Sequence, residues 1–299
     1  MTLATTTEWL LPAEAYWSSS WYAREQRRLF GRVWNFVGTV EDLAGGTTLM
    51  ATVAGEAVGI SVDDAGALTT TRGSVDAWSG LVFSHLDPEA APLAAWLGEV
   101  PERIGGFRPD RLVEVARHQF ELRANWKFFV ENHVDLYHLW YLHADSLGAY
   151  DHPRAEWETC GPHWVFYEPP RSGVDIHASS FWRGLLPIAH VGDDRWGSGA
   201  HLIFPNLTFA TGAGFFMTYQ CIPTGPDRSI VDMRVRAEPG SDATAMLALS
   251  KGIIQREDGD ACEALQVAVR SPWFAVGPLA RDHELPITRF HRCVLDHLG

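Results

Sequence analysis

The chain has 299 residues, which is enough for one or two domains with a large buried core. Its composition, 46% hydrophobic and 20% charged, predicts a soluble globular protein. The formal net charge of −13 argues against a nucleic-acid backbone or an anionic membrane as a partner, and it is compatible with a basic redox protein docking on an acidic face.

Signals for targeting are missing from the sequence, and neither a GxGxxG nor a GxxxxGK[ST] motif indicates a nucleotide site. Residues 1–7 contain no basic cluster followed by an apolar run, which predicts no secretory signal. The longest uncharged stretch, 196–226, contains prolines and turn residues and favours sheet and turns over a membrane span. The four cysteines form no CxxC pair, as in a reduced intracellular protein. We therefore expect a cytoplasmic protein without a membrane partner.

The first part of the chain predicts a helix followed by a small sheet. Residues 12–33 have a helical pattern that ends in apolar side chains. From residue 37 to about 86, short runs of β-branched and small residues alternate with glycine-rich turns. This alternation predicts the hairpins of a small antiparallel domain. Residues 88–109 then predict a helix and a linker.

The second part of the chain predicts a larger sheet and a long helix. A strand-rich stretch covers 164–236, and a helical pattern follows from about 242 to 270. Strands followed by a long helix indicate an α+β fold in which the helix packs across a curved antiparallel sheet.

The most informative motif lies between residues 125 and 143. Asp135 and His138 are three residues apart, so a helix would place them on one face. His143 follows five residues later and can meet His138 only if the helix ends or turns near Trp140. Two imidazoles with a carboxylate behind the first are typical of half a metal site with an outer hydrogen bond already provided.

A third candidate ligand, Asp258, lies in the late helix. It falls on the apolar stripe of Ile254, Ala261, Cys262 and Leu265. A carboxylate that points into a core is costly unless it is paired, protonated or bound to a metal.

A His, His, Asp set with open positions is the facial arrangement of non-haem Fe(II) oxygenases. The neighbouring carboxylates Glu257 and Asp260 are expected to be solvated. A structural role is the alternative, because an HxxxxH pair is more often structural than metal-binding. Spacing alone leaves the two interpretations open.

The motif also carries a family resemblance. The run 125–143, with Asn125-Trp126-Lys127 at its start and Tyr137-His138 near its end, resembles the catalytic motif of Rieske non-haem iron aromatic-ring-hydroxylating oxygenase α subunits. Further segments resemble the same family, so the resemblance covers nearly the whole chain; they are 29–38, 78–83, 204–206 and 257–266.

The resemblance implies a fold and a set of ligands. It implies a truncated Rieske-like antiparallel β domain over 1–117, followed by a helix-grip (START/SRPBCC-like) catalytic domain over 118–299. By this match His138, His143 and Asp258 bind a mononuclear Fe(II). Asp135 is then the carboxylate that bridges to the cluster of a neighbouring subunit and relays the electron.

The helix-grip cavity is the expected substrate pocket. Its candidate lining residues, which have plain core packing as the alternative, are Trp140, His201, Phe204, Phe209 and Phe215.

One departure from the family is large. The family's first domain holds a [2Fe–2S] cluster through two cysteines and two histidines. This chain has no cysteine before Cys160, and its only histidine before His118 is His85. Between residues 60 and 78, where the cluster loops belong, we expect only a short turn-rich connector. The sequence therefore predicts a shrunken first domain without a [2Fe–2S] cluster.

Three functions are compatible with these features. The leading hypothesis is an oxygenase subunit that keeps its iron and oxidises a small organic substrate with O2, by hydroxylation, demethylation, desaturation or cyclisation. Electrons would come from a cluster-bearing paralogous subunit in a hetero-oligomer, fed by a ferredoxin or reductase. The alternative is a non-catalytic scaffold or regulatory subunit of such an oxygenase. A third possibility is a metal-independent binding module for an apolar ligand.

Overall fold

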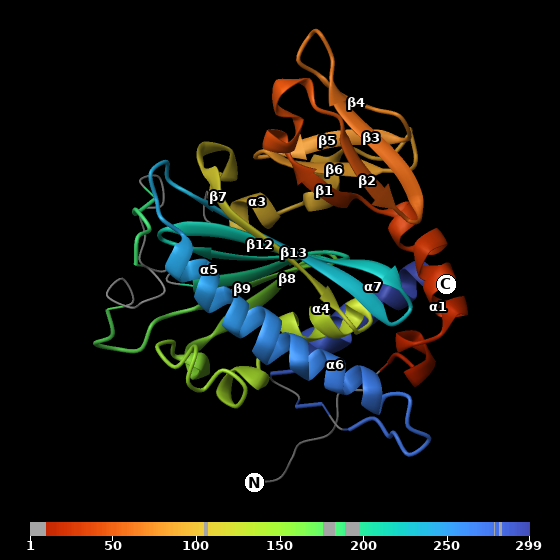
Figure 1. The fold of residues 1–299 in the computed structure, drawn as a ribbon. Coiled ribbons are helices and arrows are strands. Elements are labelled where there is room, and N and C mark those ends of the chain that lie inside the picture. Colours follow the sequence, from red (N-terminus) through yellow and green to blue (C-terminus); the bar gives the residue numbers. More distant parts are fainter. Residues whose placement is uncertain (1–9, 105–106, 176–182, 189–197, 278, 281–282) are drawn as a thin grey trace.

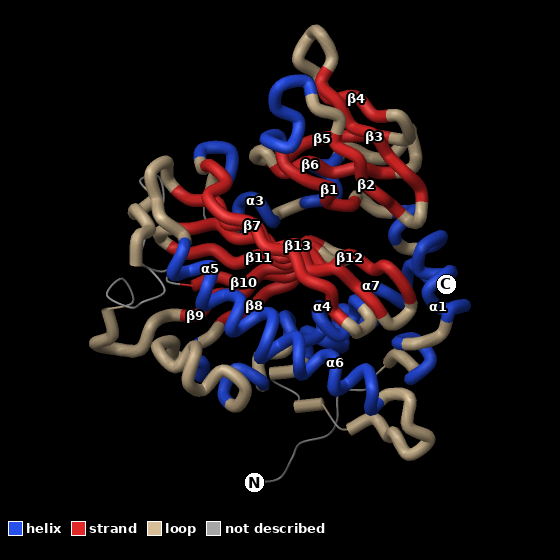
Figure 2. Tube along the Cα trace, in the orientation of Figure 1, coloured by secondary structure: helices blue, strands red, loops and turns tan. Residues whose placement is uncertain are grey.

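The computed structural model describes residues 10–104, 107–175, 183–188, 198–277, 279–280 and 283–299. A large antiparallel sheet forms the middle layer, with long helices on one face and a small β domain on the other (Figures 1 and 2). The opening segment 1–9, which underlies the prediction of no secretory signal, lies outside the described residues. No helix within the described ranges is long and apolar enough to cross a membrane.

The middle layer is a seven-stranded sheet in the order β7-β13-β12-β11-β10-β9-β8. Every neighbouring pair in it is antiparallel. Its strands are β7 (Val113–Leu122), β8 (Glu156–Cys160), β9 (His163–Glu168), β10 (Ser198–Ile203), β11 (Leu207–Gly212), β12 (Phe215–Gly225) and β13 (Arg228–Ala237).

Helices cover one face of this sheet and share the larger hydrophobic core with it. A long helix runs obliquely across the sheet, as Figure 1 shows, and changes from α to π and back to α. The helices of this layer are α4 (Trp126–Val134), α5 (Thr244–Ser250), the π-helix η10 (Lys251–Asp258), α6 (Gly259–Ala268) and α7 (Leu285–Leu298). The predicted α+β order, strands followed by a long helix across an antiparallel sheet, is confirmed.

The small β domain consists of two three-stranded antiparallel sheets. One sheet has the order β1-β6-β5 and the other β2-β3-β4. The strands are β1 (Asn35–Thr39), β2 (Leu49–Val53), β3 (Glu56–Val62), β4 (Leu68–Thr70), β5 (Ser74–Trp78) and β6 (Leu81–His85). Strands β4 and β5 therefore occupy the stretch between 60 and 78, where a turn-rich connector was expected.

Short helices flank the small domain and link it to the large sheet. They are η1 (Ala13–Tyr16), α1 (Ser19–Arg28), η2 (Phe30–Arg32), η3 (Val40–Gly46), α2 (Leu93–Leu97), α3 (Val100–Arg103) and η4 (Pro109–Arg111). Strand β7 belongs wholly to the large sheet and runs through residues 117 and 118. The division of the chain into two domains between residues 117 and 118 therefore remains a prediction.

Two buried arginines of β13 join the small domain to the sheet. Arg234 Nη1 lies 2.7 Å from Asp42 Oδ2, and Arg236 Nη1 lies 2.8 Å from Glu41 Oε2. Both carboxylates belong to η3 of the small domain. The domain therefore sits fixed over one face of the sheet, and the opposite face is left to the helices.

Strand β9 shows how the sheet divides its side chains between the two faces. Alternate residues of a strand point to opposite faces. Trp164 and Phe166 belong to the core beneath the helices, whereas Val165 belongs to the core beneath the small domain and Tyr167 packs against it. The same alternation turns Glu168 toward the helix side.

A buried polar network fixes α4 between the N-terminal and C-terminal helices. Lys127 Nζ lies 2.6 Å from Glu25 Oε1, and neither side chain is exposed to solvent. One turn later, Glu131 Oε1 accepts a hydrogen bond from the Tyr16 hydroxyl at 2.6 Å and lies 3.0 Å from His291 Nε2. These contacts set the position of the helix that leads into the 135–143 segment.

Candidate metal centre and its cavity

Helix α4 ends before the residues that the motif places on it. It stops at Val134, and Asp135 has an extended backbone with φ −72° and ψ 125°. The Asp135 carboxylate then accepts two backbone N–H groups, from Tyr137 to Oδ1 at 2.7 Å and from His138 to Oδ2 at 3.2 Å. An aspartate commonly caps a turn in this way. The contact between Asp135 and His138 is therefore made by a turn and not, as expected, by a shared helix face.

The short 3-10 helix η5 (His138–Trp140) follows this turn. The imidazoles of His138 and His143 contact each other, with ring centroids 4.9 Å apart. The Nδ1 atom of His138 faces Asp135 Oδ2 at 3.4 Å, which leaves Nε2 of the same ring directed away from that carboxylate.

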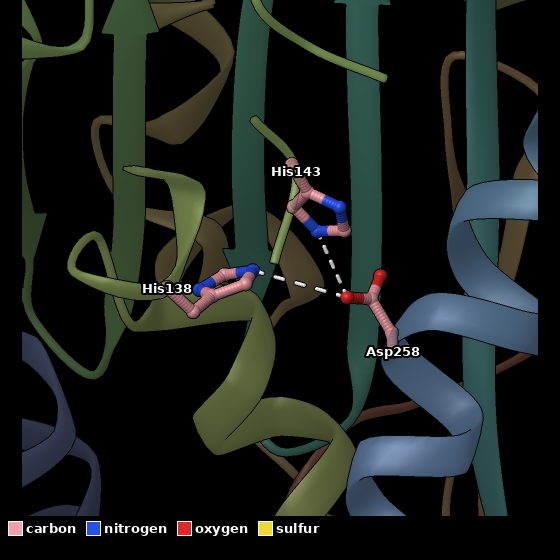
Figure 3. Close-up of side chains that lie close together, drawn as sticks. All are labelled: His138, His143 and Asp258. Carbon is pink, nitrogen blue, oxygen red and sulfur yellow. Dashed lines mark ion pairs between the residues drawn. The ribbon is translucent and has the colours of Figure 1, made fainter. Parts of the chain in front are cut away.

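Three side chains from two distant segments converge, as Figure 3 shows. Asp258 Oδ1 lies 2.9 Å from His143 Nε2 and 3.8 Å from His138 Nε2. One potential ligand atom from each of the three side chains lies within 4.8 Å of the others. His138 and His143 lie in the η5 segment and the loop after it, and Asp258 is the last residue of the π-helix η10.

The donor set fits a divalent metal ion. Asp258 Oδ1 is buried without a hydrogen-bond partner in the described part of the chain, although His143 Nε2 is only 2.9 Å away. A buried carboxylate oxygen without a partner is costly unless a cation compensates it. Two imidazole nitrogens and one carboxylate oxygen suit first-row transition metals.

Glu257 holds the other side of the His143 ring. His143 Nδ1 donates a hydrogen bond to Glu257 Oε2 at 2.6 Å, and Ser146 Oγ donates to the same oxygen at 2.7 Å. The prediction that Glu257 is merely solvated is therefore wrong. Burial lowers the pKa of His143, but Asp258 and Glu257 on its two sides more than offset this, so that the pKa is raised overall.

A cavity of about 130 Å³ opens beside the three side chains. Its wall includes His138, His143 and Asp258, and it extends along the helix side of the large sheet. The small side chain of Ala200 and the backbone of Gly199, both in β10, also lie in this wall. The aromatic residues of the lining are Phe129, Tyr150, Trp164, Phe166, Phe215 and Tyr219.

Of the five residues predicted around a substrate pocket, Phe215 lies in this lining and four do not. His201 and Phe209 pack against each other, with ring centroids 4.8 Å apart, and Phe209 belongs to the core on the opposite face of the sheet. Phe204 packs against Phe290 at 6.1 Å, and Trp140 packs against His283 at 4.6 Å. Strand parity explains the first pair, because the side-chain alternation turns them away from the helices.

The cavity-wall residues that were not predicted include His133 and Glu168. His133 contacts His201 O through Nε2 at 2.9 Å, and burial lowers the pKa of His133 to about 4. It is therefore a neutral wall residue at physiological pH. Glu168, at the end of β9, contributes a carboxylate that His152 contacts through Nδ1. The alternation Trp164, Phe166, Glu168 was the signal that could have revealed it.

Comparison with known proteins assigns these features to a family. The sequence model of the ring hydroxylating alpha subunit (catalytic domain) matches residues 109–299. The chloroplastic choline monooxygenase of Atriplex hortensis is 24% identical over 232 residues, 73% of this chain and 48% of that protein. The Arabidopsis thaliana choline monooxygenase is 27% identical over 210 residues, 68% of this chain and 46% of that protein. The chain thus spans about half the length of the curated relatives it matches.

Solved structures share the whole fold at low sequence identity. The quaternary ammonium Rieske monooxygenase CntA in complex with L-carnitine has a TM-score of 0.79 and 16% identity, and the alignment covers 98% of this chain and 97% of that one. Naphthalene 1,2-dioxygenase from Rhodococcus sp. bound to indole has a TM-score of 0.73 and 14% identity, with 96% and 94% covered. At these low identities, the structural similarities show a common fold alone.

Proposed function

The chain belongs to the ring hydroxylating alpha subunit family, and on that premise we propose that it is a Rieske-type oxygenase subunit with a mononuclear non-haem Fe(II) site. His138, His143 and Asp258 would hold the iron. The observation that carries the proposal is the convergence of two imidazole nitrogens on a buried carboxylate oxygen that has no hydrogen-bond partner among the described residues.

The iron, the carboxylates of Asp135 and Glu257, and the aromatic lining would have separate roles. Bound Fe(II) supplies the activation of O2 for hydroxylation, demethylation, desaturation or cyclisation of the substrate. Glu257 accepts a hydrogen bond from His143 Nδ1 and would orient that ring. Asp135 Oδ2 lies 3.4 Å from His138 Nδ1, which has no hydrogen-bond partner among the described residues, and would orient that ring through its charge. The aromatic lining excludes water and holds the substrate beside the two rings.

We further propose that this chain has no [2Fe–2S] cluster of its own and receives electrons from a cluster-bearing paralogous subunit. A ferredoxin or reductase would deliver the electrons to that subunit. The sequence supports this, because no cysteine precedes Cys160 and only His85 precedes His118. Electrons would enter through Asp135. Tyr137 and Tyr141 next to it are 41% and 70% exposed, as a surface that docks a partner subunit requires.

A small quaternary ammonium compound is the proposed substrate class. The curated relatives are named for choline, and one solved neighbour is a quaternary ammonium monooxygenase bound to carnitine. The aromatic rings of the cavity wall support the transfer of this substrate class to the present chain, because methylated ammonium groups bind well against aromatic faces.

The remaining proposals concern organisation and location. We propose that the chain divides into a truncated Rieske-like domain over 1–117 and a catalytic domain over 118–299. A cytoplasmic location is proposed on the four cysteines, which are all free thiols.

An Asp258→Ala variant, with Asp260→Ala as its matched control, tests the proposed function. Asp260 is exposed and two residues from Asp258. The chain is purified with its cluster-bearing paralogue, and iron content and substrate-dependent O2 consumption are measured. We expect Asp258→Ala to lose iron and activity and Asp260→Ala to keep both. A complex that keeps full activity without the Asp258 carboxylate would instead identify the chain as a scaffold subunit.

A further inference from the structure

We propose that Glu168, held in position by His152, makes the cavity selective for a positively charged substrate. The inference rests on the proposed function only in taking the cavity as the substrate site. It assigns charge recognition to a particular side chain that lies on the sheet, away from the metal-ligand helix.

Strand alternation places Glu168 in the cavity wall. Trp164, Phe166 and Glu168 are alternate residues of β9, and all three line the cavity. The first two are the large apolar side chains expected on a buried strand face. Glu168 continues their row with a carboxylate that is only 3% exposed. Burial of a carboxylate in such a row is unfavourable unless it is paired.

His152 provides this pairing without filling the site. Its Nδ1 atom contacts Glu168 Oε1, and both side chains are buried. Within the described part of the chain, His152 is the only hydrogen-bond partner of the Glu168 carboxylate. The second oxygen, Oε2, therefore stays available to a ligand in the cavity.

Paired backbone segments hold the two side chains together. Tyr150 forms a β-bridge with Pro170, and Asp151 N donates to Pro169 O at 2.9 Å. These contacts fasten the 149–152 segment beside the end of β9. The Glu168–His152 pair is thus preorganised, so the entropic cost of ordering it when a ligand binds is small.

The charges of the cavity wall favour a cation. The described lining contains the three carboxylates of Asp135, Asp258 and Glu168, and it contains no lysine or arginine. Asp258 faces the two histidine ligands and Asp135 caps the turn before them. Glu168 is neither one of the three candidate metal ligands nor part of the turn that Asp135 caps. Its charge can therefore act on the substrate.

The chemistry of recognition follows from this arrangement. A quaternary ammonium group has no N–H to donate, so it is recognised by charge attraction and by contact with aromatic faces. Tyr150, Trp164 and Phe166 line the same cavity as the Glu168 carboxylate. The aromatic faces accommodate the methyl groups of either a charged or an uncharged ligand. The carboxylate distinguishes between the two.

A pair of isosteric probes measures this distinction. Choline and 3,3-dimethyl-1-butanol have the same shape, but a carbon replaces the charged nitrogen in the second. Calorimetric titration of the 299-residue chain gives the affinity for each probe without any turnover. The variants are Glu168→Gln and, as the matched control, Glu156→Gln, because Glu156 is an exposed carboxylate on the adjacent strand β8.

We expect the wild-type chain and Glu156→Gln to prefer choline by at least about 10-fold, since a buried carboxylate near a cation contributes well over RT. Glu168→Gln should reduce the preference to about 2-fold or less, while leaving the affinity for dimethylbutanol unchanged. Because the variant leaves His152 without its partner, the paired replacement Glu168→Leu with His152→Phe serves as a second measurement and should lose the preference as well.

The inference is overturned if the wild-type chain binds both probes equally or binds neither. It is also overturned if either Glu168 variant keeps the wild-type preference. Failure of the proposed function is a separate result, because a chain that never holds iron can still show the Glu168-dependent preference, and an active oxygenase can lack it.

Discussion

Glu257 Oε2 and His143 Nδ1 are joined by a 2.6 Å hydrogen bond on the side of the imidazole ring opposite Asp258. Glu257 and Asp258 are consecutive residues, and yet they contact the two different nitrogens of one ring. This is possible because the ring lies between their side chains at the end of the π-helix. Such wide helical turns are frequent at functional sites.

Removal of the Glu257 carboxylate should weaken metal binding. We expect Glu257→Ala to lower the affinity for Fe(II) or Zn(II) about 10- to 100-fold, because partners behind a ligating histidine fix its orientation and raise its basicity. Asp260→Ala, one turn away and exposed, is the control. Equilibrium dialysis with metal analysis gives both affinities, and equal affinities in the two variants would contradict the prediction.

Asp135→Asn should separate metal binding from electron delivery. The amide retains the shape of the carboxylate but not its charge, so we expect iron content near that of the wild-type chain. Turnover driven by the cluster-bearing partner should fall on the order of 10- to 100-fold, the usual effect of changing a partner of a metal ligand. Asp145→Asn, the same replacement at an exposed aspartate, is the control. Partner-driven turnover at the wild-type rate would argue against Asp135 as the relay.

The buried ion pair of Lys127 and Glu25 should be sensitive to loss of either partner. Lys127→Met leaves the Glu25 carboxylate buried, with Trp126 Nε1 at 3.0 Å as its remaining donor among the described residues. We expect a loss of about 3–5 kcal/mol in the free energy of unfolding, as for other broken buried pairs. Denaturant titration provides the value. The exposed Arg27→Met should change it by less than about 0.5 kcal/mol.

His163 should make the protein less stable in mild acid. Its Nε2–H donates to Trp96 O at 2.7 Å and its Nδ1 accepts from Phe204 N at 3.1 Å, so the ring is held in its neutral form. Burial lowers the pKa of His163 from 6.5 to about 4. Below pH 6.5 the unfolded chain therefore binds a proton that the folded chain does not.

The stability contributed by neutral His163 is full above pH 6.5 and is lost as the pH falls toward 4. The maximum loss is about 3 kcal/mol, taken from the pKa difference. Denaturant titrations at pH 7 and pH 5 should show this fall in the wild-type chain. In His163→Leu the fall should be smaller, by about 1 kcal/mol or more. An identical pH dependence in both proteins would show that His163 titrates normally.

The sequence predicted the order of helices and strands along the chain more accurately than the contacts between them. The motif spacing indicated that Asp135 lies next to His138, but a turn makes the contact, because the Asp135 side chain bonds two backbone N–H groups after the helix ends. The loop from 138 to 147 passes along the Glu257 side of the late helix. Nothing in the local sequence encodes that path, and for this reason Glu257 was expected to be solvated.

The buried face of the late helix was also predicted only in part. Leu265 was placed on the apolar stripe and is 46% exposed, whereas its neighbour Gln266 is 5% exposed. Gln266 is tolerated inside because its amide bonds Asn125 N at 2.8 Å and Tyr16 O at 3.0 Å. A polar side chain with two such partners does not show itself in an apolar pattern.

The alternation of side chains along the strands limited how well the cavity lining could be predicted from the sequence. Alternation groups Trp164, Phe166 and Glu168 on one face, but it does not say which face meets the helices. That choice depends on which side the small domain covers, and His201 and Phe209 were assigned to the wrong side for the same reason.

The wide turn that precedes Asp258 has a consequence for the length of the chain there. Excision of a single residue from 251–257 would let the spiral tighten to its ordinary pitch, because a π turn holds about one residue more than an α turn. The protein could then keep its helical content and still lose the wide turn at which Glu257 and Asp258 contact the two nitrogens of His143. Homologous chains should thus tolerate substitutions in this interval far more readily than gaps.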